Sequence, residues 1–194
     1  MLSLLTTLLA CQPPPASPPL QAVDVSVSLE TALAACVAVG DGDCALDSIL
    51  VRGALTARSC ERVPAGRARS ECFFLAAEAS GEVAVGHGLC DRAGEFSRDC
   101  HFHLWQAELL ALRPGAEDRP NPHPEAAAAM ARHRPYLSAI DAGYERRFWS
   151  WYWGAWWQQQ PSRSSEGCEA LAAPLDTECA RWHGEAMGWL DGRR

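Results

Sequence analysis

The chain has 194 residues, a formal net charge of −7 and no lysine, so that every basic residue other than histidine is an arginine. The acidic balance and the scattered arginines exclude a nucleic-acid partner, because phosphate binding needs clustered basic side chains. The length suits one domain or one compact repeat array that follows a short leader.

The leader is the apolar stretch of residues 1–10, which ends in Leu8-Leu9-Ala10 directly before Cys11. It is shorter than the roughly 20 apolar residues that span a bilayer and is typical of the hydrophobic region of an export signal. Leu8-Leu9-Ala10-Cys11 resembles the bacterial lipobox, which implies a signal peptide over 1–10 and a lipid on Cys11. The alternative is an ordinary apolar N-terminus in which Cys11 is a buried cysteine.

Residues 11–27 are predicted to be a tether. The segment 12–19 is rich in proline, which favours extended polyproline II with a reach of about 3.1 Å per residue. Such a spacer would hold a folded domain, residues 28–194, away from a membrane. Gln12 after Cys11 resembles the residue found there in lipoproteins sorted to an outer membrane, facing the periplasm or the exterior.

The eight cysteines after Cys11 predict a disulfide framework, because their number is even and the leader implies export. Eight cysteines allow 105 pairings, but neighbours share a pattern. Each neighbouring pair encloses a Gly or Pro, and its second cysteine follows an acidic residue, as at a helix start. Ser70, Ser97 and Thr177 are the expected N-caps. The predicted pairs are Cys36 with Cys44, Cys60 with Cys72, Cys90 with Cys100, and Cys168 with Cys179.

One of these junctions resembles a known repeat. Ala35-Cys36, seven residues, and then Cys44-Ala45-Leu46 is similar to the disulfide-linked junction of cysteine-rich Sel-type repeat proteins, which are solenoids of paired helices. The resemblance covers about a dozen residues. It implies stacked helical hairpins as the architecture.

Helical spacing of apolar residues dominates the rest of the chain, so the predicted fold is all-α, with stacked antiparallel helical hairpins joined by disulfides. Residues 98–112 carry one apolar stripe, and the prolines of 119–124 predict a loop. We expect an interruption at Pro135. The expected helices are 28–36, 45–53, 72–80, a short one that ends at Gly94, 98–112, 125–140, 144–160 and two near the C-terminus.

The aromatic run over 148–157 is the most unusual stretch. Its rings cover nearly every face of a helix, so one core-facing stripe cannot bury all of them. One interpretation is a central helix surrounded by the others. The other is a surface that binds a protein, a membrane or a glycan, since Trp and Tyr join an apolar body to a polar edge. The candidate binding residues are Trp149, Trp151, Tyr152, Trp153, Trp156 and Trp157.

No metal or cofactor site is predicted. His101 and His103 lie two positions apart on a helix and point about 200° away from each other, so they cannot share one ion, and His87 is expected to be structural as well. Asp41-Gly42-Asp43 begins like a calcium loop but lacks the later oxygen ligands, which favours a turn. The chain has no serine-hydrolase, P-loop or dinucleotide motif.

These features predict a non-enzymatic envelope lipoprotein. Its partners would be the membrane, through the lipid, and an envelope protein or cell-wall glycan on the helical surface. The rival hypothesis is an envelope hydrolase with two acid/base carboxylates beside an aromatic cleft near residues 149–157. The chain itself points to no catalytic residue.

Overall fold

The computed structural model describes residues 25–112, 123–159 and 168–192. Within these ranges the chain is helical, which confirms the predicted all-α class. The elements are α1 (Leu29–Ala38), α2 (Gly42–Val51), α3 (Ala57–Arg62), α4 (Arg67–Ala79), α5 (Val83–Cys90), η1 (Gly94–Phe96), α6 (Ser97–Ala111), α7 (His123–Leu137), α8 (Tyr144–Gln159), η2 (Cys168–Ala170) and α9 (Leu175–Asp191).

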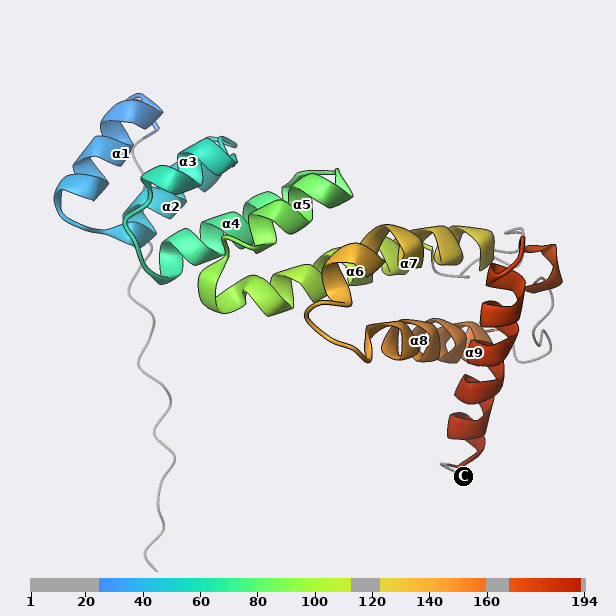
Figure 1. Ribbon diagram of the computed structural model, residues 1–194. Helices are drawn as coiled ribbons and strands as arrows, with labels where there is room; N and C mark the ends of the chain where they lie inside the picture. Colours follow the sequence, from blue (N-terminus) through green and yellow to red (C-terminus); the bar gives the residue numbers. More distant parts are fainter. Residues whose placement is uncertain (1–24, 113–122, 160–167, 193–194) are drawn as a thin grey trace, which may run out of the picture.

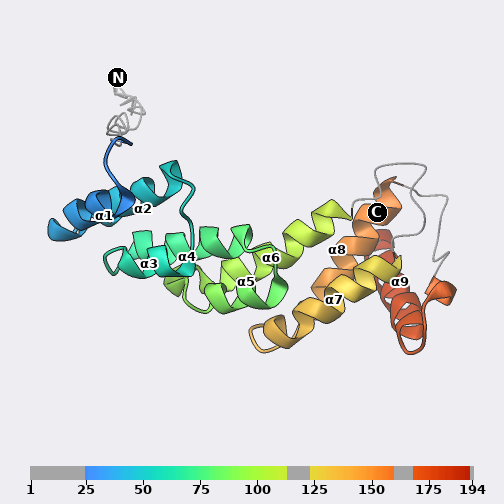
Figure 2. The same cartoon turned by 90° about the horizontal axis from the view of Figure 1, so that it is seen from above.

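The helices form an elongated row. Figure 1 shows α1 to α3 at one end and α7 to α9 at the other, with α4 to α6 between them. Figure 2 shows the same succession from above. Neighbours in sequence pack on one another, α1 on α2, α4 on α5 and α8 on α9. None of the helices in the described ranges is long and apolar enough to cross a bilayer.

Polar caps explain where the first helices begin. The Ser28 hydroxyl accepts a hydrogen bond from the Thr31 amide at 3.2 Å, and the Asp41 carboxylate accepts one from the Cys44 amide at 2.9 Å. Each bond satisfies an amide that has no partner inside its helix. Cys44 therefore sits in a first turn, as the sequence predicts.

The predicted caps of the later helices are wrong. Ser70 and Thr177 lie inside α4 and α9, and Ser97 is the first residue of α6. In α4 the chain enters the helix at Gly66, whose φ of 142° is open mainly to glycine. Ser70 instead donates its hydroxyl to the Gly66 carbonyl at 3.3 Å, so Cys72 lies in the second turn rather than at the helix start.

Proline does not interrupt α7, which corrects another expectation. Pro135 lies inside the helix, but both Pro135 and Ala131 face solvent. Water can therefore hydrate the Ala131 carbonyl, whose helical amide partner is missing. Pro124, expected in a loop, lies in the first turn of α7, where its absent N–H costs no helical hydrogen bond.

Two hydrophobic cores lie along the row. The first joins α1 to α5 and includes Leu33 and Ile49, whose side chains are fully buried. The second joins α6 to α9 around Leu109, Met130 and Phe148. Burying one such side chain contributes about 1.5 to 3 kcal/mol. The stripe expected on 98–112 is confirmed, because it faces this second core.

Four disulfides fasten consecutive elements. Each predicted pair is bonded, with Cα–Cα distances of 5.4 to 5.6 Å. Each encloses 8 to 12 residues of sequence separation, so each bond restricts the unfolded chain by about 2.5 to 3 kcal/mol. The cysteines thus fix the hairpin junctions locally and do not link the two ends of the row.

Candidate functional site

An open cleft lies between α6, α8 and α9, with one contribution from α4. Its volume is about 1240 Å³. Phe74 of α4 and Phe102 of α6 provide apolar wall, and the buried ring of Trp105 forms part of the floor. The cleft therefore brings together side chains from helices as far apart in sequence as α4 and α9.

Three arginines rim this cleft. The guanidinium carbons of Arg98 and Arg147 each lie 5.8 Å from the ring centroid of Phe102, a cation–π distance. Arg147 forms an ion pair with Asp141. Arg98 and Arg146 have no ion-pair partner among the described residues. Two guanidinium groups are thus open to an anion from outside the chain.

The aromatic run divides between core and cleft. Trp149, Tyr152 and Trp153 are at most 3% exposed and belong to the second core. Trp151 is 39% exposed, lines the cleft and meets Trp105 edge to face at 6.4 Å. The side chains of Trp156 and Trp157, and the whole of Cys11, lie outside the described residues.

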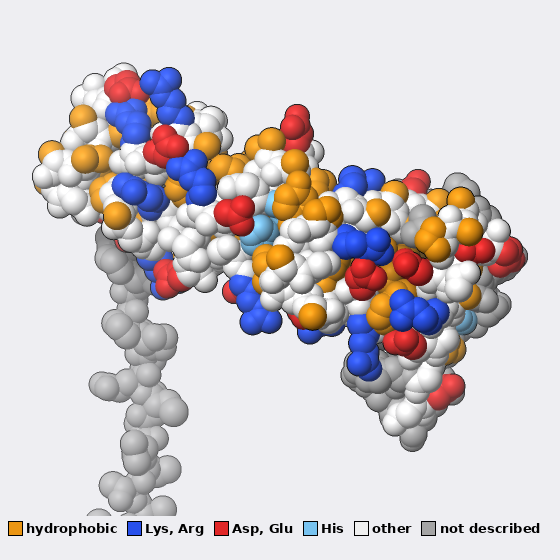
Figure 3. Space-filling view, viewed as in Figure 1, with side chains coloured by type: hydrophobic (Ala, Val, Ile, Leu, Met, Phe, Trp, Pro, Cys, Tyr) orange, Lys and Arg blue, Asp and Glu red, His pale blue; other side chains and the backbone are white. Residues whose placement is uncertain are grey.

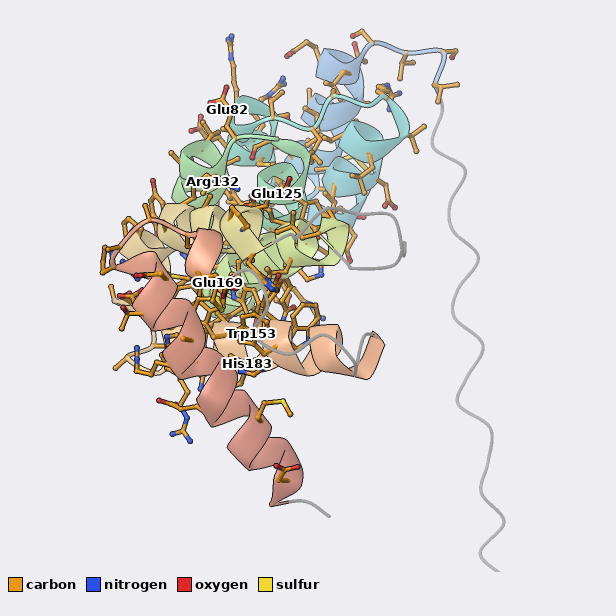
Figure 4. The ribbon with its side chains drawn as sticks, turned by 90° about the vertical axis from the view of Figure 1, so that its right-hand side faces the viewer. Glu82, Glu125, Arg132, Trp153, Glu169 and His183 are labelled. Atoms are coloured by element: carbon orange, nitrogen blue, oxygen red, sulfur yellow. A yellow bond between two sulfur atoms is a disulfide. The ribbon has the colours of Figure 1, made fainter. Side chains whose placement is uncertain are left out.

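The buried part of the run also contacts histidines. Figure 4 shows Trp153 of α8 and His183 of α9 directed toward one another, and their ring centroids are 5.0 Å apart. His123 also packs against Trp153, with ring centroids 4.4 Å apart, and its Nδ1 lies 2.6 Å from the Tyr152 hydroxyl. These contacts explain why one helix can bury rings on more than one face.

Two carboxylates line the cleft, Asp99 from α6 and Glu185 from α9. Both residues are exposed, and Glu185 lies 3.5 Å from Arg181. A carboxyl group that acts as a general acid at neutral pH needs a desolvated environment. Asp99 and Glu185, as exposed residues, do not have this environment among the described residues.

The histidines considered in the sequence occupy different surroundings. His103 is exposed and paired with Glu78, whereas His87 and His101 are buried. The structure brings His87 and His101 together with His133, to which the sequence analysis assigned no role. Within the described residues no group of three or more His, Cys, Asp or Glu side chains is arranged to hold a metal ion.

His133 could have been found from its spacing. Ala126, Met130, His133 and Leu137 recur at helical intervals and are all buried, so His133 stands on the core-facing stripe of α7. A histidine in that register has to find a hydrogen-bond partner inside the protein. The arginine cleft carries no comparable signal, because its residues come from separate helices.

No protein-family model matches the chain, and no curated protein or solved structure matches it either. Figure 3 shows basic, acidic and hydrophobic side chains interspersed over the C-terminal helices.

Proposed function

We propose that this protein is a lipid-anchored, non-enzymatic interaction module of a cell envelope. Its cleft between α6, α8 and α9 binds a segment of a partner protein that carries acidic and apolar side chains. The observation that supports the proposal most is that Arg98 and Arg146, which have no ion-pair partner among the described residues, lie in one cleft with the partly exposed ring of Trp151.

The charge of the cleft favours an anionic ligand. The chain as a whole carries −7, yet the arginines outnumber the carboxylates along this cleft. An excess of one charge along a concave surface raises the local concentration of oppositely charged groups. Guanidinium groups pair with carboxylates through two parallel hydrogen bonds, which fixes orientation as well as affinity.

The apolar surface favours a ligand with side chains to bury. Trp and Arg dominate the energetics of protein interfaces because they combine large contact area with hydrogen bonding. Trp151, Phe102 and Phe74 offer this area beside the arginines. A neutral glycan chain would leave the guanidinium groups unpaired, so an acidic peptide segment fits the cleft better.

The anchor is the second part of the proposal. It is supported by the Leu8-Leu9-Ala10-Cys11 motif, by the proline-rich segment 12–19 and by the disulfide-rich domain that follows. Disulfides persist in oxidising compartments outside the cytosol. A tethered domain would present its cleft to partners in that compartment.

Synthetic peptides test the cleft directly. The probe is a 12-residue peptide in which Glu alternates with Leu and Phe, and its control carries Gln in place of each Glu. Binding is measured by fluorescence anisotropy on the folded, oxidised protein. We expect the Glu peptide to bind more tightly than the Gln peptide, with an affinity that falls as salt is added.

Charge reversal separates the cleft from the rest of the surface. Arg98→Glu or Arg146→Glu should each weaken binding by 10- to 100-fold, because a hydrogen bond to a charged group contributes about 1.5 to 3 kcal/mol. Arg58→Glu on α3 is the matched control, since Arg58 is exposed and lies outside the cleft. Equal binding of both peptides, or tighter binding of a cell-wall glycan fragment, would contradict the proposed occupant.

A further inference from the structure

Three buried histidines form a continuous chain between helices. His87 Nδ1 of α5 lies 2.7 Å from His101 Nδ1 of α6, and His87 Nε2 lies 2.8 Å from His133 Nδ1 of α7. All three residues are at most 2% exposed. His87 therefore uses both of its ring nitrogens to join two other helices.

A carboxylate lies at each end of this row of three histidines. His101 Nε2 lies 3.1 Å from Asp91 Oδ1, and His133 Nε2 lies 2.8 Å from Glu108 Oε2. The Asp91 side chain is 73% exposed, whereas the Glu108 side chain is 27% exposed and also pairs with Arg132. The Asp91 end is thus open to solvent, whereas the Glu108 end is mostly covered.

The number of hydrogens on these five groups decides how many of their contacts can be hydrogen bonds. Four contacts join the five groups, and each needs one hydrogen between its two heteroatoms. Three neutral imidazoles carry three such hydrogens, and two carboxylates carry none. The neutral chain therefore lacks one hydrogen, and it has room for one additional proton.

The missing hydrogen falls at the Asp91 end. Water can hydrate the exposed Asp91 carboxylate, whereas an unprotonated contact at the less exposed Glu108 would set a nitrogen lone pair against a carboxylate oxygen. The N–H groups of the neutral chain thus point toward Glu108. A proton from solvent then binds His101 Nε2 beside Asp91 and completes the fourth contact.

A second additional proton on one of the three rings would break this row of hydrogen bonds. It would put hydrogens on both nitrogens of an imidazole pair whose atoms are 2.7 or 2.8 Å apart. The pKa directions agree with this limit. Burial, followed by the neighbouring His133 and His101, lowers the pKa of His87 to about 3. Burial also lowers the pKa values of His101 and His133, and their carboxylate partners oppose that shift.

The row of histidines lies where the two hydrophobic cores meet. His87 stands at the edge of the first core, and His133 on the buried face of α7 in the second. Tyr136 of α7 stacks on His87 with ring centroids 4.2 Å apart. Gly86 permits the close approach of α5, because a Cβ there would lie 2.9 Å from Leu104 Cδ1 of α6.

Other charged groups on the surrounding elements have their own partners. Glu78 of α4 pairs with His103 on the far side of α6, and Arg134 of α7 pairs with Glu145 of α8 and Glu178 of α9. Arg92, beside Asp91, pairs with Glu61 of α3. Among the described residues, Asp91, Glu108 and Tyr136 contact the three rings, and Arg132, which is paired with Glu108, acts on His133 through its charge.

The geometry is that of hydrogen bonds and not of metal ligation. Imidazole nitrogens that share a tetrahedral zinc ion bond it at 2.0 to 2.1 Å and therefore stand more than about 3 Å apart. The two histidine contacts here are shorter, and they leave from opposite nitrogens of His87. The nitrogens follow one another in a line and do not converge on a point.

We propose that the hydrogen-bonded row Asp91, His101, His87, His133 and Glu108 is a pH-dependent connection between α5 and α7, which we call a latch. It takes up one proton from solvent at its Asp91 end with every contact kept. It releases α7 from α5 when a second proton binds. This inference is independent of what occupies the cleft.

Histidine NMR on the full, oxidised chain tests the uptake. With ¹⁵N-labelled imidazoles, the three rings should change in one shared pH step, because coupled sites titrate as a unit. Asp91→Asn should move that step down by about one pH unit, since it removes the charge that favours the proton. Glu82→Gln is the matched control, an exposed carboxylate at the start of the same helix. Separate steps for the three rings, or an unchanged step in Asp91→Asn, would overturn the proposal.

Hydrogen exchange tests the release. At the shared step itself, amides of α5 and α7 should keep their protection, because the first proton preserves every contact. At a lower pH, where the second proton binds, they should lose protection together while α1 and α2 keep theirs, after correction for the intrinsic pH dependence of exchange. The same exchange measurement is made on Asp91→Asn, because the exposed Asp91 side chain can be changed without disturbing the fold. Loss of protection in all helices at once, or its persistence in α5 and α7 at low pH, would show that no latch exists.

Discussion

Trp149 and Trp151 are two residues apart on α8 but should respond very differently to replacement by alanine. Trp149 is 1% exposed and meets Phe148 and Tyr152 edge to face, with ring centroids 5.1 and 5.7 Å away. Truncating a buried tryptophan leaves a cavity and costs about 3 to 5 kcal/mol. At about 2 to 4 °C per kcal/mol for a chain of this size, Trp149→Ala should lower the melting temperature by roughly 6 to 20 °C.

Trp151→Ala removes a side chain that is 39% exposed and faces the cleft. More than a third of its surface is exposed in the cleft, where water can take the place of the ring, so we expect a smaller loss than for Trp149→Ala, about 1 to 2 kcal/mol. Binding of the Glu-containing peptide should fall at least tenfold, because the ring provides contact area beside the arginines. Trp149→Ala, measured below its melting temperature, should keep most of that affinity.

The assays are thermal and urea unfolding followed by circular dichroism, with the disulfides intact, and peptide anisotropy on the same samples. The reasoning would be refuted if Trp151→Ala destabilised the protein as much as Trp149→Ala. It would also fail if Trp151→Ala bound the peptide like the wild type. The first result would place Trp151 in the core, and the second would remove it from the cleft's binding surface.

Three further predictions follow from the described contacts. Burial lowers the pKa of His87 from 6.5 to about 3, so below pH 6.5 the unfolded protein binds a proton that the folded protein does not. The free energy of unfolding should therefore be constant above pH 6.5 and fall by about 2 kcal/mol between pH 7 and 5. Urea midpoints at each pH measure this change. Replacing Cys90 and Cys100 together by serine should cost about 2.5 to 3 kcal/mol in the same assay and leave the helical circular dichroism signal in place. Cys11→Ser should abolish incorporation of labelled palmitate and release the protein from membranes; continued labelling would contradict the anchor.

Local features of the fold could be predicted from the sequence because they depend on residues close together in the chain. The disulfide pairs span short turns, and the stripe over 98–112 is written in the spacing of its apolar residues. The errors are local too. Ser70 resembles a cap, but Gly66 enters α4 a turn earlier, and Pro135 is tolerated because its face of α7 is wet.

The two candidate sites could not be predicted, because each joins residues that are distant in sequence. The contact of His87 with His133 spans 46 residues, and the cleft brings Phe74 of α4 to the same surface as Glu185 of α9. A single sequence carries no record of such pairings. The aromatic run left open whether its rings form a core or a binding surface, and only the packing shows that Trp149, Tyr152 and Trp153 are buried and that Trp151 is partly exposed.

Site-specific photocrosslinking in the cells that make the protein tests the central claim most directly. A photoreactive phenylalanine analogue replaces Ser150, which lines the cleft, and a second protein carries it at Val51, which is 56% exposed on α2. We predict a discrete protein adduct from position 150 that is absent from position 51 and is lost when Arg98→Glu and Arg146→Glu are added. No adduct at 150, an adduct to glycan alone, or a protein adduct that survives the charge reversals would contradict the account.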